Sequence, residues 1–177
     1  MLNEMFFAEK DASKVSTYTL NADGVDIGRF KSSGIIVSTG TGSSGWLYGA
    51  KRLSNTNVSD IAHKLKDHVR DMQRDNKLLE QAIVDSQYVE QLANQMSKET
   101  HFSPESNQMY YYVREPFDDG IHNNFSEGYA KVVKLTSELS NGQICIDGQI
   151  KYDLDYGDVC VVDNQPKYSL KCIKFIV

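Results

Sequence analysis

The chain has 177 residues, of which 40% are hydrophobic and only three are proline, and this composition is typical of a folded domain rather than a disordered or fibrous protein. Its 19 basic and 24 acidic residues give a net charge of -5, the wrong sign for a protein that neutralises many phosphates, so no nucleic-acid partner is expected. No run approaches the roughly 18 apolar residues that span a membrane, so no membrane partner is expected. The start Met1–Phe7 is too short and too acidic for a signal or transit peptide.

The start of the chain predicts strands. Apolar and polar residues alternate from Met5 to Phe30 around Asn21–Gly24 (NADG), which indicates a hairpin with a short turn. Gly34–Ser38 (GIIVS) predicts a third strand. Its glycine-rich continuation leads into a helix that begins near Trp46 and runs toward Leu53.

The middle of the chain predicts two amphipathic helices, an insertion of about residues 57–98. Apolar residues recur at helical spacing in both, so these side chains should form the inner faces. They are Ile61, Leu65, Val69 and Met72 in the first helix and Val89, Leu92, Ala93 and Met96 in the second. Charges of both signs in Lys64–Lys77 indicate a solvated outer face rather than a binding surface.

After Pro104 the sequence again predicts strands, separated by Gly, Asn and Asp turns. The segments are Met109–Phe117, Tyr129–Leu139, Gln143–Leu154, Asp158–Asn164 and Tyr168–Val177. Asp147 and Gly148 are typical of the two-residue turn of a tight hairpin. Strands, an inserted helical pair and more strands favour a mainly β fold with inserted helices (α+β), mostly antiparallel. Cys145, Cys160 and Cys172 lie in apolar strand-like runs, which favours free buried thiols over a disulfide or a metal site.

The glycines of the segment after Gly34–Ser38 allow two interpretations. Gly40, Gly42 and Gly45 fit G-x-G-x-x-G, but the consecutive strands that follow exclude a Rossmann domain, and no Gly-Lys-Ser/Thr closes a Walker loop. The segment is either a tight structural connection with side-chain capping or a loop whose N–H groups bind a phosphate, ribose or base edge. The unbroken run of glycines and hydroxyl residues, Ser38–Ser44, favours ligand binding.

Two motifs resemble those of NAD kinases. Lys31–Trp46 (KSSGIIVSTGTGSSGW) resembles a family signature in which an apolar strand runs into a Ser-Thr-x-x-Gly-Ser turn, and Asn3-Glu4 resembles the Asn-Glu or Asn-Asp pair of the same domain. The KSSG form, Trp46 and the VREP of Val113–Pro116 resemble the mitochondrial branch. The resemblance implies an NAD-kinase-like C-terminal β-sandwich domain over residues 1–177, a homodimer, and a mitochondrial location, with the cytoplasm as the alternative.

The resemblance also implies a binding site for NAD, the substrate. Asn3 and Glu4 would contact its ribose or nicotinamide portion. Ser44, Gly45 and Trp46 stand where most relatives carry the Thr, Ala and Tyr of the NAD pocket, so a phenolic hydroxyl is lost. Asp147 falls near a family Asp-Gly that approaches the ligand, often from a neighbouring subunit, although a plain turn residue is the alternative. The implied substrate-binding residues are Asn3, Glu4, Ser33, Thr41, Ser44, Gly45, Trp46 and Asp147.

Phosphoryl transfer needs a group that accepts the proton of the attacked hydroxyl and a site for ATP with Mg²⁺. In NAD kinases both come mainly from a Gly-Gly-Asp-Gly motif in a preceding α/β domain, and this sequence has no such motif. No catalytic residue and no metal ligand is therefore expected in this sequence. The binding of ATP and Mg²⁺ would require that absent N-terminal domain, so this chain by itself should be inactive.

Other functions stay open at the level of the sequence. One is the C-terminal domain of a lipid kinase of the diacylglycerol or sphingosine type, which is built similarly. Another is a non-catalytic oligomerisation module in which Asn57–Lys98 contributes to a symmetric interface. Arg114 either pairs with Glu115 or faces a phosphate, and the sequence does not decide between the two.

Overall fold

The computed structural model describes residues 1–72, 86–117 and 125–168. The chain divides into two compact units. The first, here called the β unit, comprises Met1–Leu47 and Phe102–Val177, and the second, the helical unit, comprises Tyr48–His101.

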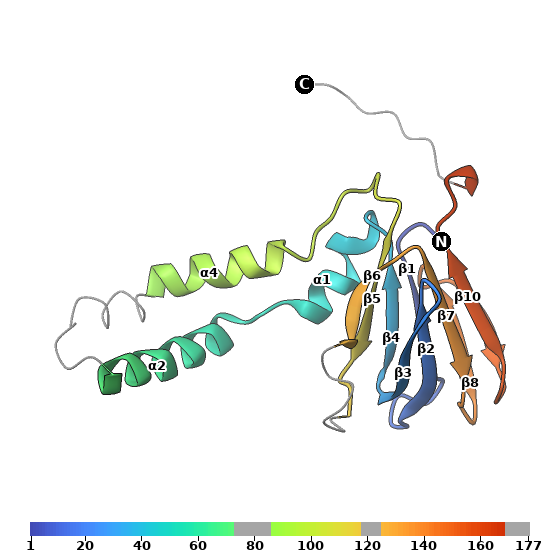
Figure 1. Cartoon of the computed structure of the whole chain (residues 1–177), viewed down its shortest axis with the longest axis horizontal. Coiled ribbons are helices and arrows are strands. Elements are labelled where there is room, and N and C mark those ends of the chain that lie inside the picture. Colours follow the sequence, from blue (N-terminus) through green and yellow to red (C-terminus); the bar gives the residue numbers. More distant parts are fainter. Residues whose placement is uncertain (73–85, 118–124, 169–177) are drawn as a thin grey trace. The chain divides into compact units, whose positions relative to one another are not determined.

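Two antiparallel sheets make up the described part of the β unit (Figure 1). The six-stranded sheet has the order β6-β5-β4-β1-β8-β9, and the four-stranded sheet has the order β10-β7-β2-β3. The strands are β1 (Glu4–Glu9), β2 (Ser16–Ala22), β3 (Val25–Ser32), β4 (Gly34–Ser38), β5 (Met109–Arg114), β6 (Glu127–Ala130), β7 (Val132–Ser137), β8 (Gly142–Ile146), β9 (Ile150–Leu154) and β10 (Val159–Asp163). This architecture confirms the predicted mainly β, antiparallel fold with inserted helices.

The core lies between the two sheets, because alternate residues of each strand point to the same side. Phe7 of β1, Ile35 of β4 and Val113 of β5 are fully buried on the inner face of the larger sheet. Tyr18 and Leu20 of β2 meet them from the smaller sheet, in the same apolar cluster. The two sheets therefore form a sandwich that buries a single core.

Both predicted hairpin turns are confirmed. Asp23 and Gly24, between β2 and β3, have φ angles of 49° and 85°, and Asp147 and Gly148, between β8 and β9, have φ angles of 50° and 70°. Positive φ at both central residues is the geometry that matches the twist of a hairpin, and Asp-Gly tolerates it well. The chemistry of these short sequences is therefore sufficient to place the turns.

The segment Tyr129–Leu139 forms two strands rather than one. The chain leaves β6 of the larger sheet at Lys131 and enters β7 of the smaller sheet. The break is stabilised because the Asp23 carboxylate accepts hydrogen bonds from the backbone N–H groups of Lys131 and Val132, at 2.9 and 2.8 Å. A strand predicted for Tyr168–Val177 lies outside the described residues, apart from the short 3-10 helix Pro166–Tyr168.

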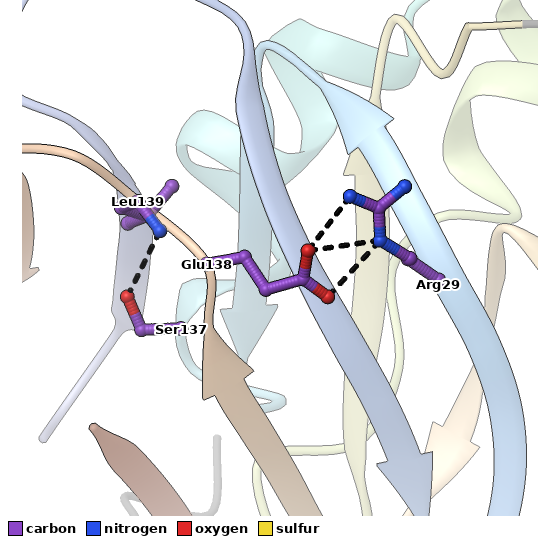
Figure 2. A network of polar contacts seen from close by, with 4 residues as sticks. All are labelled: Arg29, Ser137, Glu138 and Leu139. Atoms are coloured by element: carbon purple, nitrogen blue, oxygen red, sulfur yellow. Dashed lines mark hydrogen bonds and ion pairs between the residues drawn. The ribbon is translucent and has the colours of Figure 1, made fainter. Parts of the chain in front are cut away.

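An exposed ion pair ties the end of β7 to β3. Figure 2 shows the Arg29 guanidinium directed at the Glu138 carboxylate, with Nε and Nη2 donating at 2.7 to 3.0 Å. The hydrogen bond from Arg29 is the main reason that the pKa of the Glu138 carboxyl lies below its ordinary value. The same segment carries Leu139 into the core, so the contact orders the link from β7 of the smaller sheet to β8 of the larger one.

The helices lie where the sequence predicts them: α1 (Trp46–Lys51), α2 (Asn55–Met72) and α4 (Ser86–Lys98). Within the described residues, no helix is both long enough and apolar enough to cross a membrane. Val58 and Ala62 of α2 are buried against Val89 and Ala93 of α4. Two alanines at this contact let the helix axes approach closely.

The predicted inner face of these helices is partly wrong. Ile61 and Leu65 are 62% and 49% exposed, and Met96 of α4 is 45% exposed. Ala62, and not Ile61, lies at the contact with α4. The buried face of α2 is therefore rotated by one residue, or about 100° around the helix axis, from the predicted face. The side chains of Val69 and Met72 lie outside the described residues.

Candidate functional site

The Asn3-Glu4 pair and the glycine-rich segment after β4 lie far apart in the sequence but are neighbours in the β unit. β1 and β4 are antiparallel, and Glu4 stands opposite Ser38. The chain enters β1 through Asn3 at the same edge where it leaves β4, so Asn3 and Glu4 lie beside the segment Thr39–Gly45, here called the glycine loop.

Thr39 joins the glycine loop to the entry of β1. Its backbone N–H donates to the Asn3 carbonyl at 2.8 Å, and its Oγ1 donates to the Leu2 carbonyl at 2.6 Å. The same Oγ1 accepts a hydrogen bond from the N–H of Gly42 at 3.2 Å. One threonine therefore fixes both the start of the loop and the path of Leu2 and Asn3.

Gly40, Gly42 and Ser43 form the buried half of the loop, and their role is structural. A Cβ on Gly40 would lie 2.0 Å from the carbonyl oxygen of Ser103, and one on Gly42 would lie 2.3 Å from that of Asn3. The Ser43 hydroxyl donates to the Gly40 carbonyl at 2.7 Å and accepts from the N–H of Phe102 at 3.2 Å. For these residues the interpretation as a tight structural connection is correct.

The other half of the loop is exposed. Thr41, Ser44 and Gly45 face outward, and Trp46 is 41% exposed. The heavy atoms nearest to a Cβ built on Gly45 are the Gly42 carbonyl oxygen at 3.3 Å and Glu4 Oε2 at 4.0 Å. The residues that the loop does not need for its own packing thus lie together beside the Glu4 carboxylate.

Asp147 is a turn residue that also orders the entry of β1. Its carboxylate accepts hydrogen bonds from the backbone N–H groups of Leu2, Asn3 and Glu4, at 2.8, 2.7 and 3.2 Å. Partial burial acts to raise the pKa of the Asp147 carboxyl, but these hydrogen bonds together outweigh it, and the pKa lies below its ordinary value. The carboxylate is therefore charged at neutral pH and directed at the backbone of its own chain.

Glu4 is the half-buried carboxylate of the site. Burial raises the pKa of the Glu4 carboxyl, and the negative charge of nearby Asp147 raises it further. A carboxylate at the edge of an exposed loop can accept hydrogen bonds from hydroxyl groups of a ligand, and such bonds are stronger than those between neutral groups.

Phe6 and Arg114 lie around Trp46, the residue that follows the glycine loop. The rings of Trp46 and Phe6 are 4.7 Å apart, and the Arg114 guanidinium carbon lies 5.6 Å from the Trp46 ring centre and 5.9 Å from that of Phe6. Arg114 also pairs with Glu115 at 3.3 Å, which is one of the two roles that the sequence left open. Phe6 was not predicted, although it follows Glu4 by two residues and so shares its face of β1.

Ser33 does not join the glycine loop. It lies at the opposite end of β4, about 17 Å of strand from Ser38. Its N–H donates to the Arg114 carbonyl at 3.0 Å. A side-chain hydrogen bond with Ser33, more than the charge of Arg114, lowers the pKa of the Glu115 carboxyl. Ser33 is therefore linked to Trp46 through Glu115 and Arg114.

The described residues contain no group of three or more His, Cys, Asp or Glu side chains placed to hold a metal ion. Cys145 and Cys160 are free and half-buried rather than fully buried, and Cys172 lies outside the described residues. Burial raises the pKa of the Cys160 thiol to about 11, so it is protonated at neutral pH.

Known proteins that are similar to this chain are NAD kinases. NAD kinase 2, mitochondrial, from Xenopus tropicalis is 25% identical over 183 residues, which covers 93% of this chain and 41% of that protein. The protein of the same name from Homo sapiens is 24% identical over 159 residues, which covers 89% of this chain and 34% of that protein. The chain resembles the C-terminal domain of NAD kinases. No family model matches it.

Solved NAD kinase structures share the fold. An NAD kinase from Archaeoglobus fulgidus in complex with ATP superposes with a TM-score of 0.55 at 17% identity, covering 92% of this chain and 45% of that one. Yeast NADH kinase complexed with NADH gives a TM-score of 0.55 at 16% identity, covering 93% of this chain and 35% of that one. This chain therefore spans less than half the length of the NAD kinases it matches.

Proposed function

We propose that this chain binds NAD as the substrate-binding domain of an NAD kinase, which phosphorylates the 2′-hydroxyl of the adenosine ribose with ATP to give NADP. One observation carries the proposal: the entry of β1 and the exposed half of the glycine loop lie side by side, with Glu4 next to Gly45. The similarity to NAD kinases and the shared fold support it.

Each exposed group has a role in this proposal. The Asn3 amide donates and accepts hydrogen bonds, and the Glu4 carboxylate accepts them, at the ribose or nicotinamide portion of NAD, because an amide and a carboxylate suit vicinal hydroxyls. Thr41 and Ser44 offer hydroxyls at the rim of the site. Trp46 forms a wall against one ring of the ligand, in place of the tyrosine of most relatives.

The residues around these exposed groups either position them or contact the phosphates of NAD. Asp147 is a positioning residue, since its carboxylate already binds the backbone of Leu2–Glu4. We propose that Arg114 contacts the pyrophosphate of NAD, because its guanidinium lies against Trp46 and its ion pair with the exposed Glu115 is long, at 3.3 Å. Ser33 acts through Glu115.

The phosphoryl donor binds elsewhere in this proposal. The 177 residues contain no Gly-Gly-Asp-Gly motif, so ATP and Mg²⁺ would bind mainly to residues outside them. The chain acts as one substrate-binding domain, in which the helical unit is an insertion, within a mitochondrial homodimer.

A fluorescence titration tests NAD binding, because Trp46 is the only tryptophan of the chain. NAD should change its emission saturably, and vesicles that contain diacylglycerol should not. Trp46→Phe, followed by calorimetry, should lose the optical signal but retain measurable heat of NAD binding. A response to the vesicles and none to NAD would favour a lipid kinase domain. The absence of binding by both methods would overturn the proposal.

Turnover is measured separately. The purified chain, mixed with NAD, ATP and Mg²⁺, should bind NAD and form no NADP above background. NADP formation that rises with protein concentration would refute the assignment of the catalytic groups to residues outside this chain, while leaving NAD binding intact.

A further inference from the structure

Glu115, the ion-pair partner of Arg114, has an unusual backbone conformation. Its φ angle is 47°, in the left-handed region that residues other than glycine rarely occupy. Such a conformation persists where the surrounding structure enforces it, and it is common at functional sites. On one side of Glu115 the Arg114 carbonyl accepts a hydrogen bond from the N–H of Ser33 at 3.0 Å. On the other side the N–H of Phe117 donates to the Lys31 carbonyl at 2.7 Å, so the backbone is held at both flanks.

The Glu115 carboxylate is charged, exposed and directed at the Arg114 guanidinium. A side-chain hydrogen bond with Ser33 and, to a lesser extent, the charge of Arg114 lower the pKa of the Glu115 carboxyl, so it is ionised at neutral pH. Arg114 Nη2 and Glu115 Oε1 are 3.3 Å apart, and the Glu115 side chain is 67% exposed. An exposed ion pair is weak, because water and salt screen it. The pair can therefore open when another anion approaches Arg114.

Two aromatic rings hold Arg114 in place without the help of Glu115. The guanidinium carbon lies 5.6 Å from the centre of the Trp46 ring and 5.9 Å from that of Phe6, within the range of a cation–π attraction. Across the sheet Arg114 stands opposite Gly34, where a Cβ would lie 2.7 Å from Cζ of Phe6. The Phe6 ring therefore covers Gly34 and supports the guanidinium. Glu115 supplies a competing charge rather than the position of Arg114.

A substrate site for NAD has to reject ATP, because the two nucleotides share the adenosine half. NAD joins its halves by a pyrophosphate diester, whereas ATP ends in a triphosphate that carries more negative charge. A carboxylate beside the guanidinium repels the triphosphate more strongly, since the Coulomb energy is proportional to the charge of the ligand. Binding sites gain specificity in this way, by placing a charge that disfavours the competing ligand.

We propose that Glu115 is a specificity-determining residue, which competes with the phosphates of a bound nucleotide for Arg114 and so makes the site prefer NAD to ATP. This preference presupposes the proposed function, in which Arg114 contacts the pyrophosphate of NAD. It extends that function from the binding of a substrate to the exclusion of the phosphoryl donor from the same site. The net charge of the chain, -5, acts in the same direction.

Glu115→Gln tests the competition, because it removes the charge and nearly preserves the shape of the side chain. Calorimetry without Mg²⁺ should show that wild type binds NAD more tightly than ATP. In the variant the affinity for NAD should rise by about two- to fivefold, the range expected for an exposed ion pair, and the affinity for ATP should rise by a larger factor. Both gains should disappear at about 1 M salt, where the Debye length is about 3 Å.

Three matched variants separate the effect of this charge from a structural effect. Glu115→Asp keeps the charge and should keep the preference for NAD. Glu138→Gln removes the carboxylate of another exposed arginine pair, with Arg29 (Figure 2), and should change neither affinity. In a chain that already carries Arg114→Gln, adding Glu115→Gln should give a smaller gain in NAD affinity, because no guanidinium is left to compete for.

Two results would overturn the role of Glu115 alone. One is a Glu115→Gln variant that binds NAD and ATP with the wild-type ratio of affinities. The other is a variant that loses NAD affinity, since Glu115 would then orient Arg114 instead of competing for ligands. In both cases NAD binding by wild type leaves the proposed function intact. A wild-type chain that does not bind NAD would overturn the proposed function and the preference together.

Discussion

Gly42→Ala is the most direct perturbation of the candidate site. The added methyl carbon would lie 2.3 Å from the carbonyl oxygen of Asn3 and 2.6 Å from its carbonyl carbon. Both are backbone atoms, so no side chain can rotate away. The loop and the entry of β1 must therefore separate by about 1 Å to reach an ordinary contact distance.

The cost follows from two terms. Overpacking of a well-packed site costs about 1 to 3 kcal/mol, and weakening a hydrogen bond of Thr39 to this segment adds about 1 kcal/mol. A loss of about 2 to 4 kcal/mol lowers the melting temperature of a domain of this size by roughly 5 to 15 °C. Because Asn3 and Glu4 move relative to Ser44 and Gly45, NAD affinity should also fall by more than about tenfold when measured well below the transition.

Gly49→Ala is the matched control. It is the same substitution seven residues further on, in α1, where no heavy atom lies within 4 Å of the added carbon. Alanine also favours the helix over glycine, so stability should be unchanged or slightly higher. Calorimetric melting and NAD titration of both variants decide the matter. If Gly42→Ala melts within about 1 °C of wild type and binds NAD equally well, the account of the glycine loop is wrong.

Two further substitutions separate positioning from contact. Asp147→Asn should lower the pKa of Glu4 but leave it above its ordinary value, because burial is the larger cause; NMR titration of the carboxyl groups can follow this change. The folded-state pKa of Asp147 is depressed, so its carboxylate stabilises the wild-type fold at neutral pH. Wild type should lose this stabilisation as the pH falls below about 4 and through that lower pKa, whereas the variant lacks it at every pH. An unmoved Glu4 titration would contradict the assigned contact. Arg114→Gln should weaken NAD binding several-fold and reduce the salt dependence of that binding. Arg29→Gln, which breaks the exposed pair with Glu138, should change neither quantity. Equal effects of the two variants would exclude a local phosphate contact at Arg114.

Turns and strands could be predicted because their causes are local. Asp23-Gly24 and Asp147-Gly148 adopt positive φ angles for reasons contained in two residues. The break at Lys131 could not be predicted, because it depends on hydrogen bonds from a turn more than 100 residues away, at Asp23. The face of α2 was misassigned for a similar reason: spacing identifies an apolar stripe, but only the partner helix decides that Ala62 and not Ile61 lies at the contact.

The candidate site was predictable only in its linear parts. Asn3-Glu4 and Thr41 to Trp46 stand in recognisable motifs, and the structure places the two segments side by side. Phe6 and Arg114 join them through the register of three adjacent strands, β1, β4 and β5, which no short motif encodes. Ser33 belongs to the same linear motif as Trp46, yet the length of β4 carries it away from the glycine loop.

The glycine spacing itself reflects crowding of the backbone rather than the identity of a ligand. In a Rossmann fold the glycines allow a tight turn, an approach to the pyrophosphate and helix packing. Here Gly40 and Gly42 allow two backbone contacts inside a β sandwich, with Ser103 and with Asn3, and neither faces outward. The same pattern arises because both folds must bring main chains closer than a Cβ permits. The ligand class therefore has to be inferred from the residues that this packing leaves exposed, Ser44, Gly45 and Trp46, and from the Glu4 carboxylate that the sheet places beside them.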